Sequence, residues 1–298
     1  MGKVYIGISG WRYPPWRGVF YPPKLTQARE LEFASRAVRS IEINGSFYSL
    51  QRPESYAAWY AATPTGFIFS VKGNRYLTHI VRLRDIEKPL ANVFASGVFN
   101  LREKLGPILW QFPPNFRYAP EQLEHFFSLL PRDTEQALAL ARKRDSIMKG
   151  RTRLAIDANR PIRHAMEIRH VSFIDASFVA LLRKYRVALV VADTAGKWPY
   201  CEDVTSDFMY LRLHGDKELY ASGYTEASLD RWAARIEAWS SGGEPMDAQR
   251  IAPGSSPAAS GRDVYCYFDN DIKVRAPFDA RRLIEKLGIG AGLTPLPE

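Results

Sequence analysis

The feature of this sequence that most constrains its fold is a regular alternation of two patterns. Short apolar runs rich in Val, Ile, Phe and Tyr have the composition of buried strands. Most of the stretches between them carry apolar residues at helical spacing. The strand-like runs cover residues 4–10, 40–46, 67–73, 107–113, 164–170, 187–193, 208–215 and 264–271. Eight such alternations predict an α/β fold, a single (β/α)8 barrel of the TIM type over residues 1–298, with an open doubly wound sheet as the alternative.

The helical stretches are less uniform than the strands. They cover residues 26–39, 53–62, 89–104, 120–130, 172–184, 225–239 and 277–287. Thr26 and Ser172 occupy positions where a side-chain oxygen would cap the first turn of a helix. The connection 194–206 lacks a clear helical pattern and is the weakest link in the prediction.

Two further segments look like additions to this frame. Residues 133–163 contain an extra helix, predicted over 135–148, followed by a basic stretch. This basic helical insertion lies between the fourth and fifth strands. Residues 240–262, rich in Gly, Ser, Pro and Ala, predict a mobile loop.

Composition narrows the class of protein. The chain has 298 residues, of which 46% are hydrophobic and 24% charged, an ordinary globular composition. Its two cysteines are too few for a disulfide framework. We find neither a signal-peptide pattern nor an apolar run of about 18 residues, so we expect a cytoplasmic protein without a membrane partner.

Charge points to an anionic partner. The formal net charge is +9, and a basic balance favours phosphate or nucleic acid. Much of this excess falls in the insertion, where Arg142, Lys143 and Arg144 form a basic run. A loop over residues 9–23 mixes aromatic residues with two arginines and could stack bases or sugars, or simply close the barrel.

Polar residues gather on one face of the strands. Because successive strand residues point to opposite faces, most strands show one apolar face and one face with polar groups near the C-terminal end, where barrel active sites lie. The carboxylates of this set are Glu42, Glu167, Asp193 and Asp269, the cations are Lys72, Arg169 and Arg212, and the others are Asn44, Gln111, His214 and Tyr267.

This set has the chemistry of an active site. Glu42, Glu167 and Asp269 could supply acid and base groups, and His214 could transfer protons near neutral pH. The cations could hold a phosphate or carboxylate. Two alternatives remain open: purely structural ion pairs such as Glu167–Arg169 and Arg212–Asp193, and a divalent metal, which the neighbouring cations disfavour. We predict no cofactor.

Seven motifs, in order along the chain, resemble those of the DUF72 (YecE-like) family. They are IGISGWRYPPW from residue 6, IEINGSFY from 41, FSVKGNRYLTH from 69, LGPILWQFPP from 105, MEIRHVSF from 166, YLRLHG from 210 and YCYFDND from 265. The resemblance implies a TIM barrel of unestablished activity. It adds Arg75 and Asn270 to the expected anion-binding residues, and His79 and His170 to Asp193 and Tyr267 as supporting or capping residues. The chain departs from the family pattern in the 133–163 insertion and after Asn270.

We therefore expect an enzyme, a hydrolase, lyase or isomerase, that acts on a phosphorylated or otherwise anionic substrate at the C-terminal ends of the strands. The first alternative is a barrel that binds nucleic acid or processes phosphodiesters. The second is a barrel that binds a ligand without catalysis. Fold alone does not decide among them.

Overall fold

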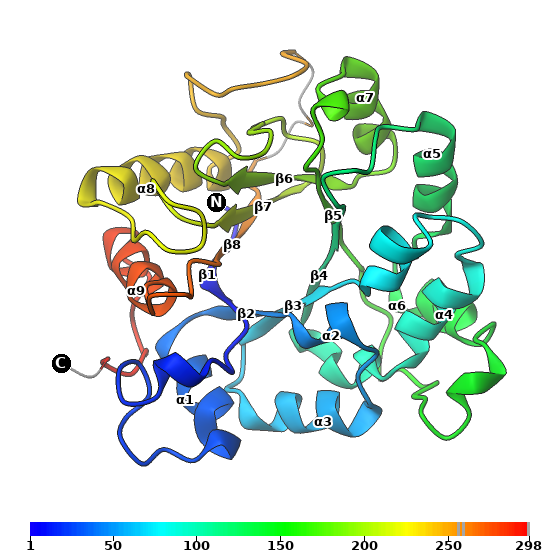
Figure 1. Ribbon diagram of the computed structural model, residues 1–298, viewed down its shortest axis with the longest axis horizontal. Helices are drawn as coiled ribbons and strands as arrows, with labels where there is room; N and C mark the ends of the chain where they lie inside the picture. The colour runs from blue at the N-terminus through cyan, green and yellow to red at the C-terminus, as the bar shows by residue number, and fades with distance from the viewer. Residues whose placement is uncertain (255–256, 258–259, 297–298) are drawn as a thin grey trace. The chain divides into compact units, whose positions relative to one another are not determined.

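The computed structural model describes residues 1–254, 257 and 260–296 (Figure 1). The chain forms two compact units. Unit 1 comprises residues 1–42 and 174–298, and unit 2 comprises residues 43–173.

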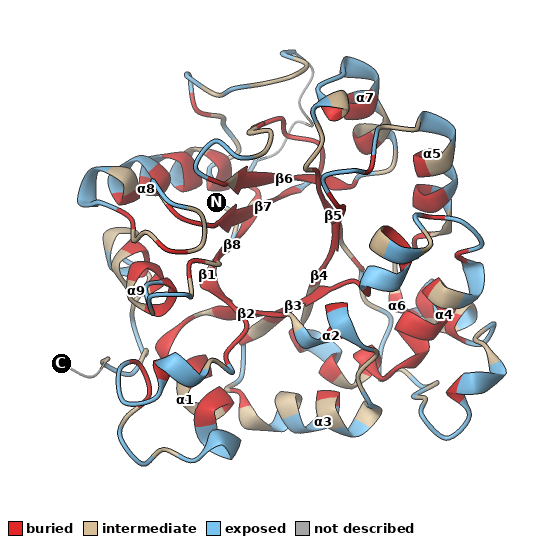
Figure 2. Ribbon diagram, in the orientation of Figure 1, coloured by how far each residue is buried: buried red, intermediate tan, exposed pale blue. Residues whose placement is uncertain are grey.

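Eight parallel strands form a closed barrel in sequence order (Figure 1). They are β1 (Val4–Ser9), β2 (Ser40–Ile43), β3 (Ile68–Lys72), β4 (Leu105–Gln111), β5 (His164–Glu167), β6 (Ala188–Asp193), β7 (Phe208–Leu213) and β8 (Asp263–Phe268). Every predicted strand is present, so the predicted (β/α)8 barrel is confirmed. The strands are almost entirely buried (Figure 2), as parallel strands covered on both faces require.

Within each unit, the strand register pairs polar residues of one strand with polar residues of the next. In unit 1 Ser9 of β1 is the partner of Glu42 of β2, and Arg212 of β7 is the partner of Tyr267 of β8. In unit 2 Gln111 of β4 is the partner of Glu167 of β5. The alternation read from the sequence therefore brings polar side chains to matching heights on neighbouring strands.

The helices follow the strands. They are α1 (Glu30–Ala37), α2 (Gly45–Tyr48), α3 (Pro53–Ala62), α4 (Glu87–Ala95), α5 (Pro120–Leu129), α6 (Thr134–Ala141), α7 (Ala176–Lys184), α8 (Glu226–Ser240) and α9 (Ala276–Lys286). Short 3-10 turns are η1 (Pro14–Trp16), η2 (Gln27–Arg29), η4 (Val98–Lys104), η5 (Ser146–Met148) and η6 (Val171–Phe173), and η3 (Tyr76–Ile80) is a π-helix. Between β6 and β7 the described chain contains no helix, in agreement with the weak pattern there.

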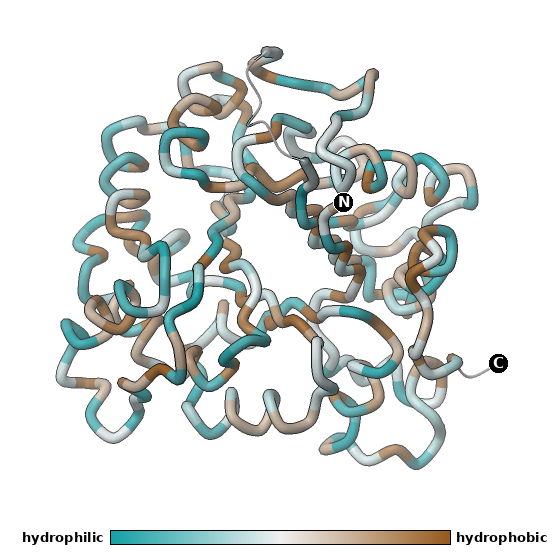
Figure 3. The backbone as a smooth tube through the Cα atoms, turned by 180° about the vertical axis from the view of Figure 1, so that it is seen from behind, coloured by the Kyte–Doolittle hydropathy of each residue, from teal (hydrophilic) through white to brown (hydrophobic). Residues whose placement is uncertain are grey.

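The amphipathic helices bury one face each, and hydrophobic and hydrophilic residues alternate along them (Figure 3). In unit 1, α8 buries Leu229, Trp232, Ile236 and Trp239. In unit 2, α5 buries Leu123, Phe126 and Phe127. Burying one such large apolar side chain contributes about 1.5–3 kcal/mol, so these faces hold the helices in place.

Two predicted helix caps are wrong. Thr26 precedes the turn η2 and its side chain makes no cap hydrogen bond. Helix α7 begins later than predicted, and its cap is Asp175, which accepts a hydrogen bond from the backbone of Ser177 at 2.7 Å. Ser172 instead binds the ring of His170 at 2.9 Å. Because α7 begins at Ala176, Asp175 and not Ser172 stands beside the free N–H groups of its first turn.

The predicted extra helix in the insertion is shorter than expected. Helix α6 ends at Ala141, and after an irregular stretch the turn η5 begins at Ser146. Arg142 and Lys143 follow α6 with exposed side chains.

In the described residues no helix combines the length and apolar character needed to cross a membrane.

The predicted mobile loop 240–262 lies in unit 1 and includes Ser255, Ser256, Ala258 and Ala259, which lie outside the described residues. Part of the loop is anchored. Asp203 accepts hydrogen bonds from the backbone of Ile251 at 2.7 Å and Ala252 at 2.9 Å.

Candidate functional site

The carboxylate of Glu42 is the centre of a buried network in unit 1. It is fully buried and accepts hydrogen bonds from Ser9 Oγ at 2.6 Å, Tyr210 OH at 2.6 Å, and Arg212 at 2.9 Å through Nη2 and 3.1 Å through Nε. A carboxylate offers about four lone-pair positions, and four donors occupy them. Since β2 and β7 are separated by β1 and β8 in the barrel order, the Glu42–Arg212 bond crosses the inside of the sheet.

Arg212 links Glu42 to a second carboxylate. Its Nη2 also donates to Asp269 Oδ2 at 2.9 Å, and its Nη1 lies 3.4 Å from His214 Nε2. His214 Nδ1 lies 3.0 Å from Asp269 Oδ2. We call Ser9, Glu42, Tyr210, Arg212, His214 and Asp269 the Arg212 cluster. Within it Asp269 keeps 14% of its side chain exposed, whereas Arg212, His214 and Glu42 are fully buried.

A further carboxyl group, Asp271, follows the cluster closely in sequence. Burial, and then the negative charge of Asp269, raises the pKa of Asp271 to about 6. The two aspartates come from the loop that follows β8, with one residue between them. A carboxyl group with such a pKa is partly protonated near neutral pH and can donate a proton.

Other predicted residues of unit 1 have supporting roles. Asp193 accepts a hydrogen bond from Tyr224 at 3.1 Å, and burial raises the pKa of Asp193. Asn270 donates to Asp279 at 2.9 Å and so ties the loop after β8 to helix α9. Tyr267 is buried and its hydroxyl lies 2.8 Å from Ser40 Oγ.

In unit 2 the polar residues form a second network. The fully buried Glu167 Oε1 accepts hydrogen bonds from Gln111 at 2.9 Å and from Arg169 at 2.8 Å. The Glu167–Arg169 pair that the sequence suggested is therefore present. Lys72 is nearly buried and its Nζ lies 4.4 Å from the centre of the Phe47 ring.

The pKa of His79 depends in part on the charged residues of this network. Burial, and then the positive charges of Arg169, Lys72 and Arg75, lowers the pKa of His79 to about 4. At neutral pH the ring is therefore uncharged. We call Lys72, Arg75, His79, Gln111, Glu167 and Arg169 the Arg169 cluster, in which cations outnumber carboxylates.

Arg75 of this cluster and two more predicted residues of unit 2 lie as follows. Arg75 is exposed and its guanidinium lies 5.7 Å from the centre of the Tyr48 ring. Asn44 precedes α2 and makes no side-chain cap. His170 accepts a hydrogen bond from the backbone of Ser172 at 3.0 Å, so it shapes the turn that follows β5.

The donor sets lack an obvious arrangement for a metal. In the described residues no group of three or more His, Cys, Asp or Glu side chains converges as metal ligands would. Arg212 lies among the acids of its cluster and neutralises the charge that a cation would need.

Comparison with known proteins gives the family. Residues 5–298 match the model of the family described as "Protein of unknown function DUF72". The chain belongs to this family. The motifs in the sequence predicted this membership.

Two curated relatives of this DUF72 protein carry UPF0759 names. It is 28% identical over 127 residues to UPF0759 protein YunF of Bacillus subtilis, which is 41% of this chain and 44% of that protein. It is 28% identical over 131 residues to UPF0759 protein YecE of Escherichia coli, which is 43% of this chain and 44% of that protein. In both comparisons the matched part spans less than half the length of the relative.

Solved structures of similar proteins share the fold. A DUF72 family protein from Thermotoga maritima has a TM-score of 0.71 at 23% identity, covering 96% of this chain and 99% of that one. A DUF72 family protein from Enterococcus faecalis has a TM-score of 0.65 at 15% identity, covering 97% and 98%. These similarities show that the fold is shared. Any inference about a reaction must come from the side chains of this chain.

Sequence reasoning did not include three residues in the site. Ser9 and Tyr210 complete the shell around Glu42, and Asp271 has the raised pKa. Strand alternation carried a signal for two of them, because Tyr210 lies two residues before Arg212 on one face of β7 and Ser9 ends β1. For Asp271 the only signal in the sequence was its position two residues after Asp269. Its burial depends on how the loop after β8 folds.

Proposed function

We propose that this DUF72 protein is an enzyme that acts on a phosphorylated or otherwise anionic substrate by carboxylate and histidine acid–base chemistry. The observation that carries the proposal is the pair of unlike aspartates after β8 in unit 1. Two carboxyl groups in different environments can divide the roles of acid and base. Asp271, with a pKa of about 6, is the proton donor in this proposal, and Asp269, which accepts a hydrogen bond from Arg212, is the base.

The rest of the Arg212 cluster then has positioning roles. Glu42 has its lone pairs occupied, so we assign it to holding Arg212 in place. Arg212 in turn fixes Asp269 through a 2.9 Å hydrogen bond. His214 lies against the same Asp269 oxygen, at 3.0 Å through Nδ1, and we assign it to orienting that carboxylate.

Anion binding is assigned to unit 2. The Arg169 cluster contains three cations and one carboxylate, Glu167, and the three positive charges add to burial in lowering the pKa of His79. Lys72, Arg75 and Arg169 are the proposed phosphate- or carboxylate-binding groups, with Asn44 and Gln111 as further polar donors. We assign Glu167 to orienting Arg169, because it accepts a hydrogen bond from that residue at 2.8 Å.

A substrate screen tests this proposal. Wild-type protein is incubated with phosphate monoesters, phosphodiesters and small carboxylates, and turnover is followed by 31P and 1H NMR. We expect one class to react, with kcat/KM reduced by about 10² or more in Asp269→Asn, the usual scale of acid–base catalysis. The control is Asp207→Asn, an exposed aspartate in unit 1. Binding without turnover would favour a ligand-binding barrel, and binding of no compound would contradict the proposal.

A second candidate is nucleic-acid binding through the insertion. Arg142 and Lys143 are exposed directly after α6, and Arg144 follows them. If these cations contact phosphates, affinity for DNA or RNA should fall steeply with salt, and neutralising all three to Gln should lower the logarithmic slope by up to about 3. Fluorescence anisotropy at several salt concentrations measures this. Absence of binding at about 50 mM salt, where basic binders retain affinity, would exclude it.

A further inference from the structure

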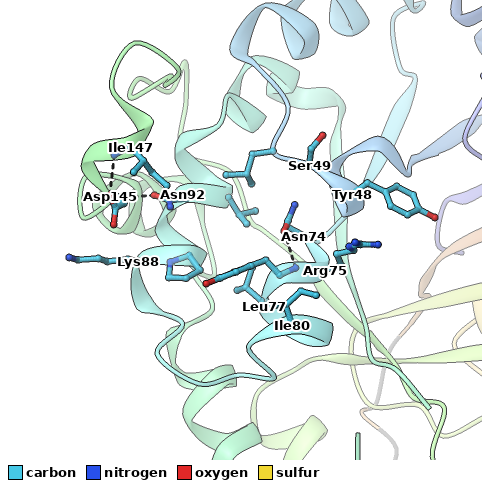
Figure 4. Close-up of a pocket in the computed structure, with 14 residues that line it drawn as sticks. Tyr48, Ser49, Asn74, Arg75, Leu77, Ile80, Lys88, Asn92, Asp145 and Ile147 are labelled. Carbon is cyan, nitrogen blue, oxygen red and sulfur yellow. Dashed lines mark hydrogen bonds between the residues drawn. The ribbon is translucent and has the colours of Figure 1, made fainter. Parts of the chain in front are cut away.

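A cavity in unit 2 goes beyond the function proposed above, with which it shares one residue, Arg75. Its volume is about 500 Å³, within the usual range of about 300–1,000 Å³ for sites that bind small molecules. It lies between Tyr48 and Arg75 on one side and Asp145 and Ile147 on the other (Figure 4). Of its lining residues, only Arg75 belongs to the Arg169 cluster, and all of them belong to unit 2.

The wall of this cavity is largely apolar and accessible. Large apolar side chains that remain exposed around it are Tyr48 at 68%, Tyr76 at 47%, Ile80 at 54% and Ile147 at 73%. Leu77 and Val93 lie buried beneath them. Exposed apolar residues grouped around a hollow mark a binding site more often than scattered ones do.

The π-helix η3 shapes one wall. Its i→i+5 geometry is seen in the hydrogen bond from the backbone of Val81 to that of Tyr76 at 2.9 Å. Single π-helical turns are rare and occur often at functional sites. Here η3 contributes Tyr76, Leu77 and Ile80 to the cavity.

The polar side chains of the cavity differ in whether they already have partners within the protein. Asn74 accepts a hydrogen bond from the backbone of Tyr76 at 3.0 Å, and Asn92 accepts one from the backbone of Asp145 at 2.9 Å (Figure 4). Asp145 accepts one from the backbone of Ile147 at 3.0 Å, which caps η5 and lowers the pKa of Asp145. Arg75, by contrast, forms no ion pair with any described residue and lies over the ring of Tyr48.

We infer that this cavity binds a small amphipathic anion, in which a carboxylate, sulfonate or phosphate group is attached to an aromatic or branched apolar body. The apolar body would lie against Leu77, Ile80 and Ile147, and the anionic group would pair with the Arg75 guanidinium beside Tyr48. This site does not depend on the proposed acid–base chemistry, because no residue of unit 1 lines it.

The probe for the test is naphthalene-1-sulfonate, with neutral 1-naphthalenemethanol as its partner, and affinity is measured by isothermal titration calorimetry. Ile147→Glu places a charge on the exposed apolar rim and is matched by Ile272→Glu, since Ile272 is 60% exposed and lies in unit 1. Arg75→Gln removes the cation and is matched by Arg117→Gln at an exposed position of unit 2. Because all four positions are on the surface, the variants should fold, and circular dichroism melting verifies this.

We expect the wild type to bind the sulfonate saturably and Ile147→Glu to weaken it about tenfold or more. Arg75→Gln should weaken the sulfonate about tenfold, the scale of a charge-assisted contact, and leave the neutral alcohol unchanged within about threefold. Both controls should match the wild type. Absence of saturable sulfonate binding, or equal affinities in Ile147→Glu and Ile272→Glu, would overturn the site. Equal losses for both probes in Arg75→Gln would overturn its anionic specificity.

Discussion

The two polar clusters use arginine in opposite ways. In unit 1 the guanidinium of Arg212 is fully buried and bound to two carboxylates, Glu42 and Asp269. In unit 2 Arg169 retains 12% of its side chain exposed beside the carboxylate of Glu167, in a cluster where cations are in excess. A buried arginine surrounded by acids fixes the positions of those acids, whereas cations in excess create a potential that attracts an anion. The difference suggests acid–base chemistry in unit 1 and anion binding in unit 2.

Removing Arg212 should have the largest effect of any change that tests this comparison. Arg212→Ala leaves two carboxylates without their cation, and we expect the free energy of unfolding in urea to fall by about 3–5 kcal/mol. Arg212→Lys keeps the charge but loses the two-pronged geometry, so its loss should be smaller.

Arg169→Ala is the matched variant in unit 2. It should destabilise the protein less than Arg212→Ala, because its site is partly exposed and Gln111 continues to donate to Glu167. Equal losses in the two alanine variants would show that both arginines are structural and would remove the basis for the comparison.

The acid role proposed for Asp271 predicts a pH dependence in unit 1. A proton donor must be protonated, so once a substrate is identified kcat/KM should fall as the pH rises through about 6, the pKa of Asp271. Asp271→Asn should lower the rate by about 10² and abolish this limb of the pH profile. A limb that persists in Asp271→Asn would assign the proton to another group.

Unit 2 should respond to acid through a buried histidine. Burial lowers the pKa of His164 to about 3, and its ring lies 2.8 Å from the carbonyl of Pro131 and 3.1 Å from Nε1 of Trp110. The unfolded chain takes up this proton near pH 6.5 and the folded chain does not. Stability is therefore fully present above about pH 6.5 and is lost as the pH falls towards 3, by up to about 1.4 kcal/mol per pH unit.

His164→Gln should make the acid limb of the stability curve shallower in urea unfolding experiments at a series of pH values. Asp271 acts in the opposite direction, since its raised pKa makes the folded state less stable as the pH rises from about 4 to about 6. An unchanged slope in His164→Gln would mean that this ring is protonated in the folded protein.

The smallest expected effect concerns how Lys72 is held. Its ammonium group lies over the Phe47 ring, and a contact of this kind contributes about 0.5–2 kcal/mol. Phe47→Leu keeps an apolar side chain and removes the ring, so the free energy of unfolding should fall by an amount in this range. If the free energy of unfolding fell as much as in Arg212→Ala, the main role of the Phe47 ring would be packing in the core and not contact with Lys72.

The sequence alone determined the frame of this protein. All eight strands and the alternation of their faces follow from local composition and from the two-residue period of a strand, which depends on no distant contact. That is why Glu42, Arg212, His214 and Asp269 could be assigned to one site from the sequence. The family motifs fall on these same strand ends.

Only the tertiary structure decided which groups meet. Alternation placed Glu42 and Arg212 on a common face, but residues 170 positions apart bind each other only because β2 and β7 face across the inside of the barrel. The cap predicted at Ser172 was wrong because α7 begins only at Ala176, where the side chain of Asp175 caps it. The pKa of Asp271 and the cavity beside Arg75 depend on burial by distant segments. Burial is a property of the packed chain, and no local pattern specifies it.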